Sequence, residues 1–288
     1  MLLADDWKDY ELIDTGEGEK LERWGSYLLR RPDPQVIWPA ADIEGAGWRK
    51  ADARYLRSSS GGGHWEYRTR LPRRWNISYG NLKFYIEPTG FKHTGLFPEQ
   101  AVNWKWMMEK IRSSGGKVRV LNLFAYTGGA TAAAAYAGAE VCHVDASKGM
   151  VSKAKENLLL SGLGDRPVRY ITDDAVKFVE REKRRGHCYE AVIMDPPSYG
   201  RGPGGELWKI EDELYRLIEL CAGVLCAKPL FFLINSYTTG LAPAVLSNVL
   251  KLTVARRFGG RIESDEVGLP VASGGLVLPC GASGRWEA

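Results

Sequence analysis

The chain has 288 residues, 44% of them hydrophobic, and a formal net charge of +4. This length and apolar content allow a buried core and indicate a soluble globular protein with one large domain, or a core domain plus a smaller one. No apolar run approaches the ~18 residues that a membrane-spanning helix needs, and the start MLLADDWKDYELID turns acidic after two leucines, unlike a secretory signal.

Residues 1 to 90 contain short stretches of alternating polar and apolar residues, such as Trp65 to Thr69 and Leu82 to Glu87. They are broken by the small-residue segment Ser58 to Gly63 and by Tyr79-Gly80-Asn81. Alternation bounded by turn residues is typical of antiparallel strands. We therefore predict a small N-terminal antiparallel β domain over residues 1 to 90.

Basic residues are concentrated in one part of this domain. Nine basic residues and only two acidic ones lie between Trp48 and Lys83. Basic groups neutralise phosphates and aromatic faces stack on unpaired bases, so this band is a candidate RNA contact surface. In the alternative interpretation, the aromatic residues form the core of the domain and the arginines are merely solvated. The aromatic residues between the basic ones are Trp48, Tyr55, Trp65, Tyr67, Trp75 and Tyr79.

The segment FKHTGLFPEQ, Phe91 to Gln100, joins the β domain to an expected helix from Glu99 to Ile111. Proline at the start of a helix and an acidic residue in its first turn are both favoured, as in Pro98-Glu99. The segment therefore indicates a junction between two domains.

The stretch from Val118 to Asp145 predicts a strand, a turn, a helix and a second strand in that order. Val118 to Phe124 is apolar and of strand length, Tyr126 to Gly129 is a turn, and Ala130 to Ala137 favours a helix. The second strand ends at Asp145, and open α/β sheets bind nucleotides at the carboxyl ends of their strands. An ionised carboxylate only accepts hydrogen bonds, so Asp145 suits the two hydroxyls of a ribose.

The turn does not match a dinucleotide site. The sequence Phe124-Ala-Tyr-Thr-Gly-Gly-Ala lacks the G-x-G-x-x-G spacing that lets backbone close on a pyrophosphate, which argues against NAD. One glycine pair instead leaves room for a small zwitterion.

The alternation of helix and strand continues after Asp145, as in a parallel sheet. Ser147 is placed to cap a helix that runs to Leu160, and Val168 to Thr172 is a third strand. Asp173 and Asp174 follow it, where a carboxylate can accept from an adenine amino group or cap the helix Ala175 to Arg184; the two roles are compatible.

A fourth strand, Tyr189 to Met194, ends in Asp195-Pro196-Pro197-Ser198-Tyr199-Gly200. Two consecutive prolines cannot donate to a ladder, so the strand stops and its carbonyls project as a rigid acceptor platform. The structural alternative is a simple turn into the next helix. The glycine-rich segment Gly200 to Gly205 is suited to admitting a large substrate.

The last part of the chain predicts a helix from Leu207 to Leu225 and an apolar strand from Leu230 to Ile234. We expect Leu252 to Phe258 and Gly275 to Pro279 to form a terminal antiparallel hairpin. The four histidines are interpreted as structural or surface groups.

The cysteines indicate the compartment. They are five in number and lack paired metal-ligand spacing, so no metal site is predicted. A reducing cytoplasm fits best. They are Cys142, Cys188, Cys221, Cys226 and Cys280.

Four sequence motifs resemble, in their order, the signatures of class I S-adenosylmethionine-dependent methyltransferases. They are LNLFAYTGGAT, HVDAS, DDAVKF and DPPSYGRG. TGLFPEQ and LNLFAYTG further resemble the large-subunit ribosomal RNA methyltransferases that act on cytosine C5 or guanine N7. The resemblance covers roughly residues 80 to 288. It implies an α/β, Rossmann-like core over residues 91 to 288, with a mostly parallel seven-stranded sheet and a terminal antiparallel hairpin.

The resemblance also implies S-adenosyl-L-methionine as cofactor, S-adenosyl-L-homocysteine as product, and roles for particular residues. Asp195, with the carbonyls of Pro196 and Pro197, would orient a base pulled out of its stack, and Tyr199 would stack on it. The residues expected near the cofactor are Thr94, Gly95, Phe97, Gln100, Phe124, Ala125, Tyr126, Thr127, Gly128, Asp145, Ala146, Ser147, Asp173, Asp174 and Asp195.

The resembled cytosine-C5 enzymes carry a nucleophilic cysteine near the strand end that here reads Asn235-Ser236-Tyr237. Its absence favours transfer to a ring or exocyclic nitrogen of RNA, with ribosomal RNA as the expected partner. Cys280 is the other candidate nucleophile. Two alternatives stay open: methylation of a protein or small molecule, because donor motifs do not identify the acceptor, and an inactive S-adenosylmethionine-binding module that assists RNA assembly. The oligomeric state is not predicted.

Overall fold

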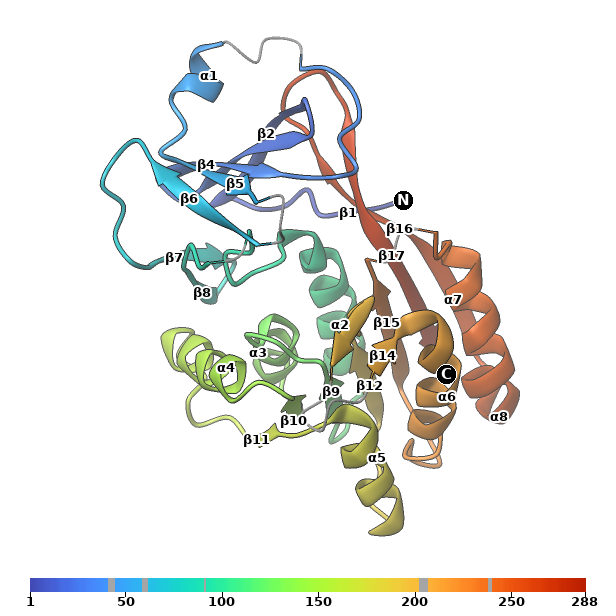
Figure 1. The fold of residues 1–288 in the computed structure, drawn as a ribbon. Helices are drawn as coiled ribbons and strands as arrows, with labels where there is room; N and C mark the ends of the chain where they lie inside the picture. The colour runs from blue at the N-terminus through green and yellow to red at the C-terminus, as the bar shows by residue number, and fades with distance from the viewer. Residues whose placement is uncertain (41–44, 59–61, 91, 202–206, 238–239) are drawn as a thin grey trace. The chain divides into compact units, whose positions relative to one another are not determined.

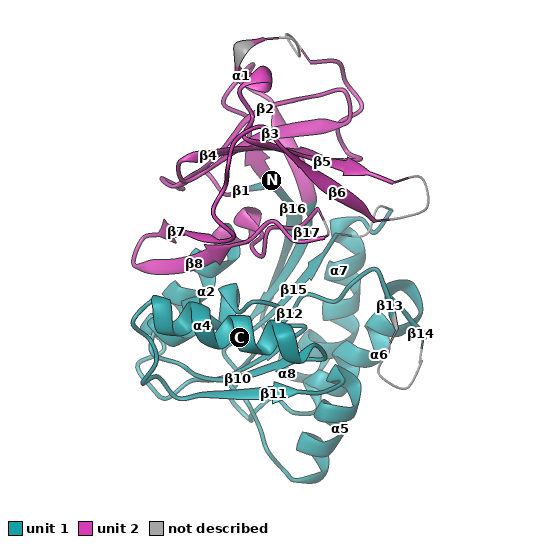
Figure 2. Cartoon of the chain, turned by 60° about the vertical axis from the view of Figure 1, so that its left-hand side comes forward, with its two compact units in different colours: residues 1–2, 102–267, 281–288 teal, residues 3–101, 268–280 magenta. Residues whose placement is uncertain are grey.

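The computed structural model describes residues 1–40, 45–58, 62–90, 92–201, 207–237 and 240–288. The chain divides into two compact units (Figure 2). Unit 1 comprises residues 1–2, 102–267 and 281–288, and unit 2 comprises residues 3–101 and 268–280. Residues 91–101 and 268–280 thus belong with the N-terminal segment, whereas the predicted division at residue 90 assigned them to the methyltransferase domain.

The sheet of unit 1 has the strand order β1-β16-β17-β15-β12-β9-β10-β11 (Figure 1). The five strands from β15 to β11 are parallel, and β17 pairs antiparallel with β15. This order confirms the predicted mostly parallel sheet, with the two-residue β1 as an additional eighth strand. The strands and helices of unit 1, some shared at its borders with unit 2, are β1 Leu2–Leu3, α2 Ala101–Ser113, β9 Arg119–Leu123, α3 Gly129–Tyr136, β10 Glu140–Asp145, α4 Lys148–Leu160, β11 Val168–Thr172, α5 Ala175–Arg184, β12 Ala191–Met194, β13 Tyr199–Arg201, β14 Leu207–Lys209, α6 Ile210–Ala222, β15 Phe231–Ser236, α7 Pro243–Leu250, the π-helix η2 Lys251–Ala255, α8 Arg256–Phe258, β16 Arg261–Pro270 and β17 Val277–Glu287.

The central strands are buried along their whole length, as a parallel sheet covered on both faces requires. Every residue of β12 and of β15 is buried. The main apolar core joins the sheet to α5, α6 and α7, through residues such as Phe178, Leu214 and Leu246. Helices α3 and α4 pack on each other and on β9, β10 and β11. Because α3 consists mostly of alanine, its backbone lies close to the sheet.

A polar network inside unit 1 connects α2 to β15 and β17. Asn103 of α2 donates to the Oδ1 atom of Asn235 at 2.9 Å, and Arg285 of β17 donates to the Oδ1 atom of Asn103 at 2.7 Å. Asn103 and Asn235 are buried, so these bonds hold elements that are far apart in the sequence. Asn235, at the strand end where the resembled enzymes carry a cysteine, is therefore a structural residue.

Unit 2 contains a five-stranded sheet in the order β2-β3-β4-β5-β6 and a separate pair, β7-β8. All pairs in these sheets are antiparallel except β4 with β5, which is parallel. The predicted antiparallel domain therefore contains one parallel pair. Its elements are β2 Tyr10–Gly16, β3 Glu19–Trp24, β4 Tyr27–Pro32, α1 Ala46–Arg49, β5 Ala53–Arg57, β6 Gly63–Tyr67, β7 Trp75–Tyr79, β8 Leu82–Ile86 and the 3-10 helix η1 Pro98–Gln100.

A buried ion pair lies in the core of unit 2. Glu22 accepts a hydrogen bond from Tyr10 at 2.8 Å and two from Arg31, at 2.6 and 2.7 Å. Burial alone would raise the pKa of Glu22, but the charges of Arg31 and Lys20 lower it below its ordinary value. The buried carboxylate of Glu22 is thus both ion-paired and hydrogen-bonded, as a buried charge must be.

Two predicted elements were wrong in part. Residues 252–258 are helical, in η2 and α8, and the terminal hairpin consists of β16 and β17. Leu207–Lys209 is a strand, and the helix predicted from Leu207 begins at Ile210. That helix, predicted to run to Leu225, ends at Ala222. No helix in the described ranges is long and apolar enough to cross a membrane.

Candidate active site at the carboxyl ends of the strands

The turn between β9 and α3 has an unusual backbone. Phe124, Tyr126 and Gly128 have positive φ angles of 53°, 49° and 82°, and such angles cost a non-glycine residue roughly 1–3 kcal/mol. Backbone hydrogen bonds fix the turn, from Ala125 N–H to the Val144 carbonyl at 3.1 Å and from Gly128 N–H to the Ala125 carbonyl at 3.0 Å. Local strain held by the surrounding structure is typical of a ligand-binding turn.

Asp145 at the end of β10 connects this turn to the next helix. Its Oδ2 atom accepts from Tyr126 N–H and its Oδ1 atom from Ser147 N–H, both at 2.8 Å. Each carboxylate oxygen keeps a further lone pair for a ligand. Burial raises the pKa of Asp145, against the effect of these two hydrogen bonds. The half-buried carboxylate is therefore able to accept from a ligand, and its contact with the ribose hydroxyls of S-adenosylmethionine stays a prediction.

Side chains of α4 support the turn. Asn157 of α4 donates to the Thr127 carbonyl at 2.9 Å. A Cβ atom at Gly128 would lie 2.8 Å from the Ala154 Cβ atom, which is too close for any residue but glycine. The strained turn is thus packed directly on α4.

The ends of β10 and β11 are joined by Asp173, whose N–H donates to the Asp145 carbonyl at 3.1 Å. The Asp173 carboxylate forms an ion pair with Arg181. The Oδ1 atom of Asp174 accepts from Lys177 N–H at 2.9 Å and caps α5, as predicted. Of the two carboxylates, Asp174 is the better candidate for the adenine contact, which stays a prediction.

At the end of β12, Asp195 is half-buried, Pro196 is buried and Pro197 is exposed. The Pro197 carbonyl accepts a hydrogen bond from the indole N–H of Trp208 at 2.6 Å. This bond uses one of the two lone pairs of the carbonyl oxygen, and its role as an acceptor for a base stays a prediction. Tyr199 is 57% exposed, so its ring is accessible for stacking.

Trp208 is the residue that the sequence analysis missed. Its ring lies 5.4 Å from the ring of Phe124, between centroids, so it connects the segment after β12 to the donor-site turn. Strand β14, which carries Trp208, pairs with β13, and Tyr199 lies opposite Lys209. The sequence Leu207-Trp208-Lys209 shows no polar–apolar alternation that could have indicated this strand. Residues 202–206, most of the predicted substrate loop, lie outside the described residues.

Four residues expected near the cofactor, Thr94, Gly95, Phe97 and Gln100, belong to unit 2. Thr94 and Gln100 are buried. Phe97 packs on His93, with the ring centroids 5.3 Å apart. Their contact with the cofactor stays a prediction.

Cys280 also belongs to unit 2. Its thiol donates to the Leu278 carbonyl at 3.4 Å. Burial raises the pKa of this thiol well above its ordinary value. Since the thiolate is the nucleophilic form, this environment argues against a covalent role.

The basic band of unit 2 has an exposed part and a buried part. Trp48, Tyr55 and Tyr79 belong to the core, whereas Tyr67 is 54% exposed. The stacking surface expected from six aromatic residues is therefore smaller than predicted, because the alternative interpretation holds for three of them. The basic residues of the band that are exposed are Arg49, Lys50, Arg57, Arg68, Arg70, Arg73, Arg74 and Lys83.

Comparison with solved structures identifies a close likeness over the whole chain. A crystal structure of the S-adenosylmethionine-dependent methyltransferase from Agrobacterium tumefaciens is 37% identical, with a TM-score of 0.93 over 99% of this chain and 92% of that one. A Streptococcus mutans structure described as a methyltransferase of the same kind is 16% identical, with a TM-score of 0.75 over 98% and 76% of the two chains. The second likeness shows the fold alone.

Among curated proteins, the ribosomal RNA large subunit methyltransferase K/L of Shewanella frigidimarina is 36% identical over 122 residues, 42% of this chain and 16% of that protein. The ribosomal RNA large subunit methyltransferase K of Neisseria meningitidis serogroup B is 24% identical over 229 residues, 77% of this chain and 64% of that protein. The chain spans between 16% and 31% of the length of the first three curated relatives it matches.

The sequence motifs, the fold and the comparisons all indicate S-adenosylmethionine as the cofactor. A family model described as S-adenosylmethionine-dependent methyltransferase matches residues 38–256, which is most of the chain. Its match includes the turn after β9, Asp145 and the segment after β12. The chain belongs to the S-adenosylmethionine-dependent methyltransferase family.

Proposed function

We propose that this chain transfers the methyl group of S-adenosylmethionine to a ring or exocyclic nitrogen of a nucleobase in RNA, with ribosomal RNA as the substrate. The observation that carries the proposal is the pair of carboxylates at one edge of the unit 1 sheet. Asp145 ends β10 and Asp195 follows β12, while the contact between Phe124 and Trp208 joins their two loops.

The donor side of this site is built from backbone and one carboxylate. Asp145 would accept from the ribose hydroxyls, and the turn from Phe124 to Gly128 would close on the amino-acid part of the donor. S-adenosylmethionine, when bound, supplies a methyl group on a positively charged sulfur. The chain contributes the fixed position of that donor, because the turn is held by Val144 and Asn157.

On the acceptor side, Asp195 would orient a base amino group, with the Pro196 carbonyl as a second acceptor and Tyr199 as a stacking surface. Guanine N7 carries its own lone pair and needs only positioning against the donor. An exocyclic amine would donate to Asp195 and lose its proton after transfer. Neither route needs a cysteine, which is consistent with the protonated thiol of Cys280.

Two observations support RNA as the acceptor. The curated relatives described above are named as methyltransferases of large-subunit ribosomal RNA. In addition, unit 2 exposes eight basic residues between Arg49 and Lys83, and such residues can neutralise phosphates. These observations favour RNA over a protein or a small molecule as the acceptor. We propose further that ribosomal RNA is the partner of the chain and the cytoplasm its location.

The test is transfer of labelled methyl from S-adenosylmethionine to protein-free RNA from cells that lack this chain. Nucleoside mass spectrometry then identifies the labelled base and atom. Label on one nitrogen of one base is the expected result, and Cys280→Ser should retain full transfer.

Label on cytosine C5 that is lost in Cys280→Ser would contradict the nitrogen assignment. Absence of label, when calorimetry shows donor binding and assembled ribosomal particles also stay unlabelled, would contradict RNA methylation. It would favour a protein or small-molecule acceptor, or a binding module without turnover.

A further inference from the structure

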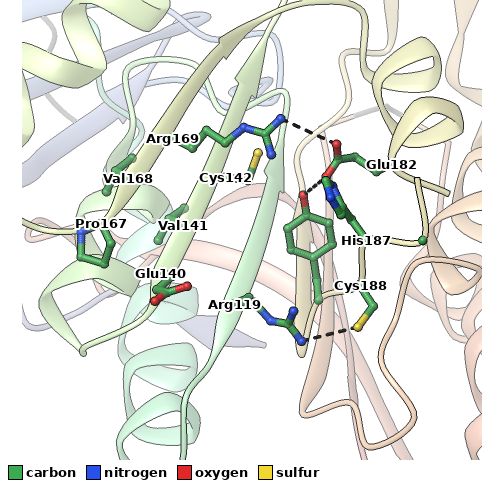
Figure 3. Close-up of a pocket in the computed structure, with 12 residues that line it drawn as sticks. Arg119, Glu140, Val141, Cys142, Pro167, Val168, Arg169, Glu182, His187 and Cys188 are labelled. Atoms are coloured by element: carbon green, nitrogen blue, oxygen red, sulfur yellow. Dashed lines mark hydrogen bonds and ion pairs between the residues drawn. The ribbon is translucent and has the colours of Figure 1, made fainter. Parts of the chain in front are cut away.

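A pocket of about 540 Å³ lies at the amino ends of β9, β10 and β11. Because these strands are parallel, this edge of the sheet is opposite to the one that carries Asp145. Figure 3 shows the residues that line it, among them Arg119, Arg169 and Cys188. The proposed methyl transfer uses none of them.

Cys188, at the wall of this pocket, is in contact with a second cysteine. The Sγ atoms of Cys188 and Cys226 are 2.9 Å apart, and a disulfide bond is about 2.0 Å long. The two chain segments are joined by hydrogen bonds from Tyr189 N–H to the Val224 carbonyl and from Cys226 N–H to the Tyr189 carbonyl, each 2.9 Å. A bond between the sulfurs therefore needs little movement of the backbone.

Arg119 lies near both thiols, and Glu190 distinguishes them through its contact with Cys226. The Nη2 atom of Arg119 lies 3.4 Å from the Cys188 sulfur and 3.2 Å from that of Cys226. The Cys226 sulfur lies 2.9 Å from the Cys188 sulfur and 3.0 Å from the Oε1 atom of Glu190, and its single proton can be donated to one of them at a time. Burial, Cys188 and Glu190 raise the pKa of Cys226 far above its ordinary value.

Cys226 therefore keeps its proton. Cys188 lines the pocket, so its sulfur is within reach of a molecule that enters there. Cys142, which also lines the pocket, is different: burial raises the pKa of its thiol to about 11. Cys188 is thus the best placed nucleophile of the pocket.

We propose that Cys188 and Cys226 form a reversible disulfide by exchange with a low-molecular-mass disulfide that enters this pocket. The Cys188 thiolate attacks one sulfur of that disulfide, whose S–S bond breaks and whose other half leaves as a thiolate. The Cys226 sulfur then attacks Cys188 and loses its proton, and the second half leaves as a thiol. In total, two cysteine thiols are oxidised to one disulfide, and one small disulfide is reduced to two thiols.

The size of the pocket suits a small disulfide such as oxidised glutathione. Arg119 and Arg169, whose side chains are 41% and 48% exposed, form ion pairs with Glu190 and Glu182, so the pocket does not select an anion by charge. The volume of the pocket, about 540 Å³, lies within the range of ~300–1,000 Å³ that is usual for small-molecule sites.

The experiment is equilibration of the full-length reduced protein in buffers with increasing ratios of oxidised to reduced glutathione, followed by alkylation and mass spectrometry of peptides. We expect loss of two free thiols, a linked peptide pair containing Cys188 and Cys226, and full reversal by excess reduced glutathione. Cys226→Ser should instead stop at one glutathione attached to Cys188, and Cys188→Ser should react at neither position.

Cys142→Ser serves as the matched control, because it removes a thiol of the same pocket and should leave the linked pair unchanged. Circular dichroism establishes that each variant is folded. Absence of the linked pair even in oxidised glutathione alone would overturn the proposal. So would a pair that includes Cys142, or a mixed disulfide at Cys188 that persists in the unsubstituted protein.

Discussion

His143 in β10 supports the donor site through a short chain of side chains. Its Nδ1 atom lies 2.9 Å from the Thr131 hydroxyl, which also accepts from Asn122 at 2.9 Å. All three residues are buried. Thr131 lies in the first turn of α3, so this chain fixes the helix that begins directly after the strained turn.

The burial of His143 predicts a dependence of stability on pH. Burial lowers the pKa of His143 from 6.5 to about 4. As the pH falls from 6.5 to about 4, the unfolded chain gains the proton before the folded one, so stability that is present above pH 6.5 is lost. The loss from this group is at most about 3 kcal/mol, at ~1.36 kcal/mol per pH unit. Denaturant unfolding of the protein and of His143→Gln between pH 7 and 4 measures it.

His143→Gln cannot titrate, so its free energy of unfolding should fall less steeply over this pH range. Equal slopes for the two proteins would show that His143 is protonated in the folded state or does not contribute. His93, whose pKa burial also lowers to about 4, contributes the same amount to both proteins and does not affect the comparison.

Several local features of the site could be predicted from neighbouring residues alone. Ser147 caps α4 by accepting from Met150 N–H at 3.4 Å, and Asp174 caps α5. Asp145 ends its strand as expected. These features depend on spacings of a few residues, so the sequence contains the information that specifies them.

At the scale of elements, the short strand pair β13 and β14 determines how the acceptor segment meets the donor turn. Trp208 makes two separate interactions there, one through its indole N–H with Pro197 and one through its ring with Phe124. Substitutions can therefore separate them.

Trp208→Phe removes the N–H donor and keeps an aromatic ring. We expect methyl transfer to fall by a factor of about 2 to 10, the equivalent of one hydrogen bond at ~0.5–1.5 kcal/mol, with the affinity for S-adenosylmethionine unchanged. Trp208→Ala also removes the ring and should weaken donor binding as well. Calorimetry and steady-state rates distinguish the two effects. Equal loss of donor affinity in both variants would contradict this division of roles.

The elements that were predicted wrongly are those fixed by distant partners. The terminal strand β17 pairs with β15, and Asn103 bonds with residues more than 130 positions away. Residues 252–258 have the apolar content of a strand, yet they are helical, and η2 packs against α6. No local pattern specifies such pairing, because tertiary contacts override weak propensity. The contacts of Trp208 and the Cys188–Cys226 pair were missed for the same reason.

At the scale of the whole molecule, the chain combines a donor-binding unit with a unit rich in exposed arginine. If unit 2 contacts RNA phosphates, affinity should depend on salt through these side chains. Arg57, Arg70 and Arg73 are exposed members of the basic band. Each phosphate contact that is removed should lower the slope of log K against log salt concentration by about 0.7 for single-stranded RNA.

The triple variant Arg57→Ala, Arg70→Ala, Arg73→Ala should therefore bind RNA more weakly and with a slope lower by about 2 if all three contact phosphates. Arg216→Ala is the matched control, because Arg216 is an exposed arginine of unit 1. Filter binding over a range of salt concentrations measures both. An unchanged slope in the triple variant would exclude this part of unit 2 as the RNA surface, while leaving the donor site unaffected.

The central claim is that Asp145 binds the donor and Asp195 orients the acceptor. The most direct measurement is calorimetric affinity for S-adenosylmethionine together with methyl transfer in Asp145→Ala, Asp195→Ala and the exposed-residue control Asp165→Ala. Asp145→Ala should weaken donor binding by a factor of about 10 to 100, the value of hydrogen bonds to a charged group at ~1.5–3 kcal/mol. Asp195→Ala should bind the donor normally and lose transfer. Donor affinity that is unchanged in a folded Asp145→Ala protein, or transfer that persists in Asp195→Ala, would contradict the account.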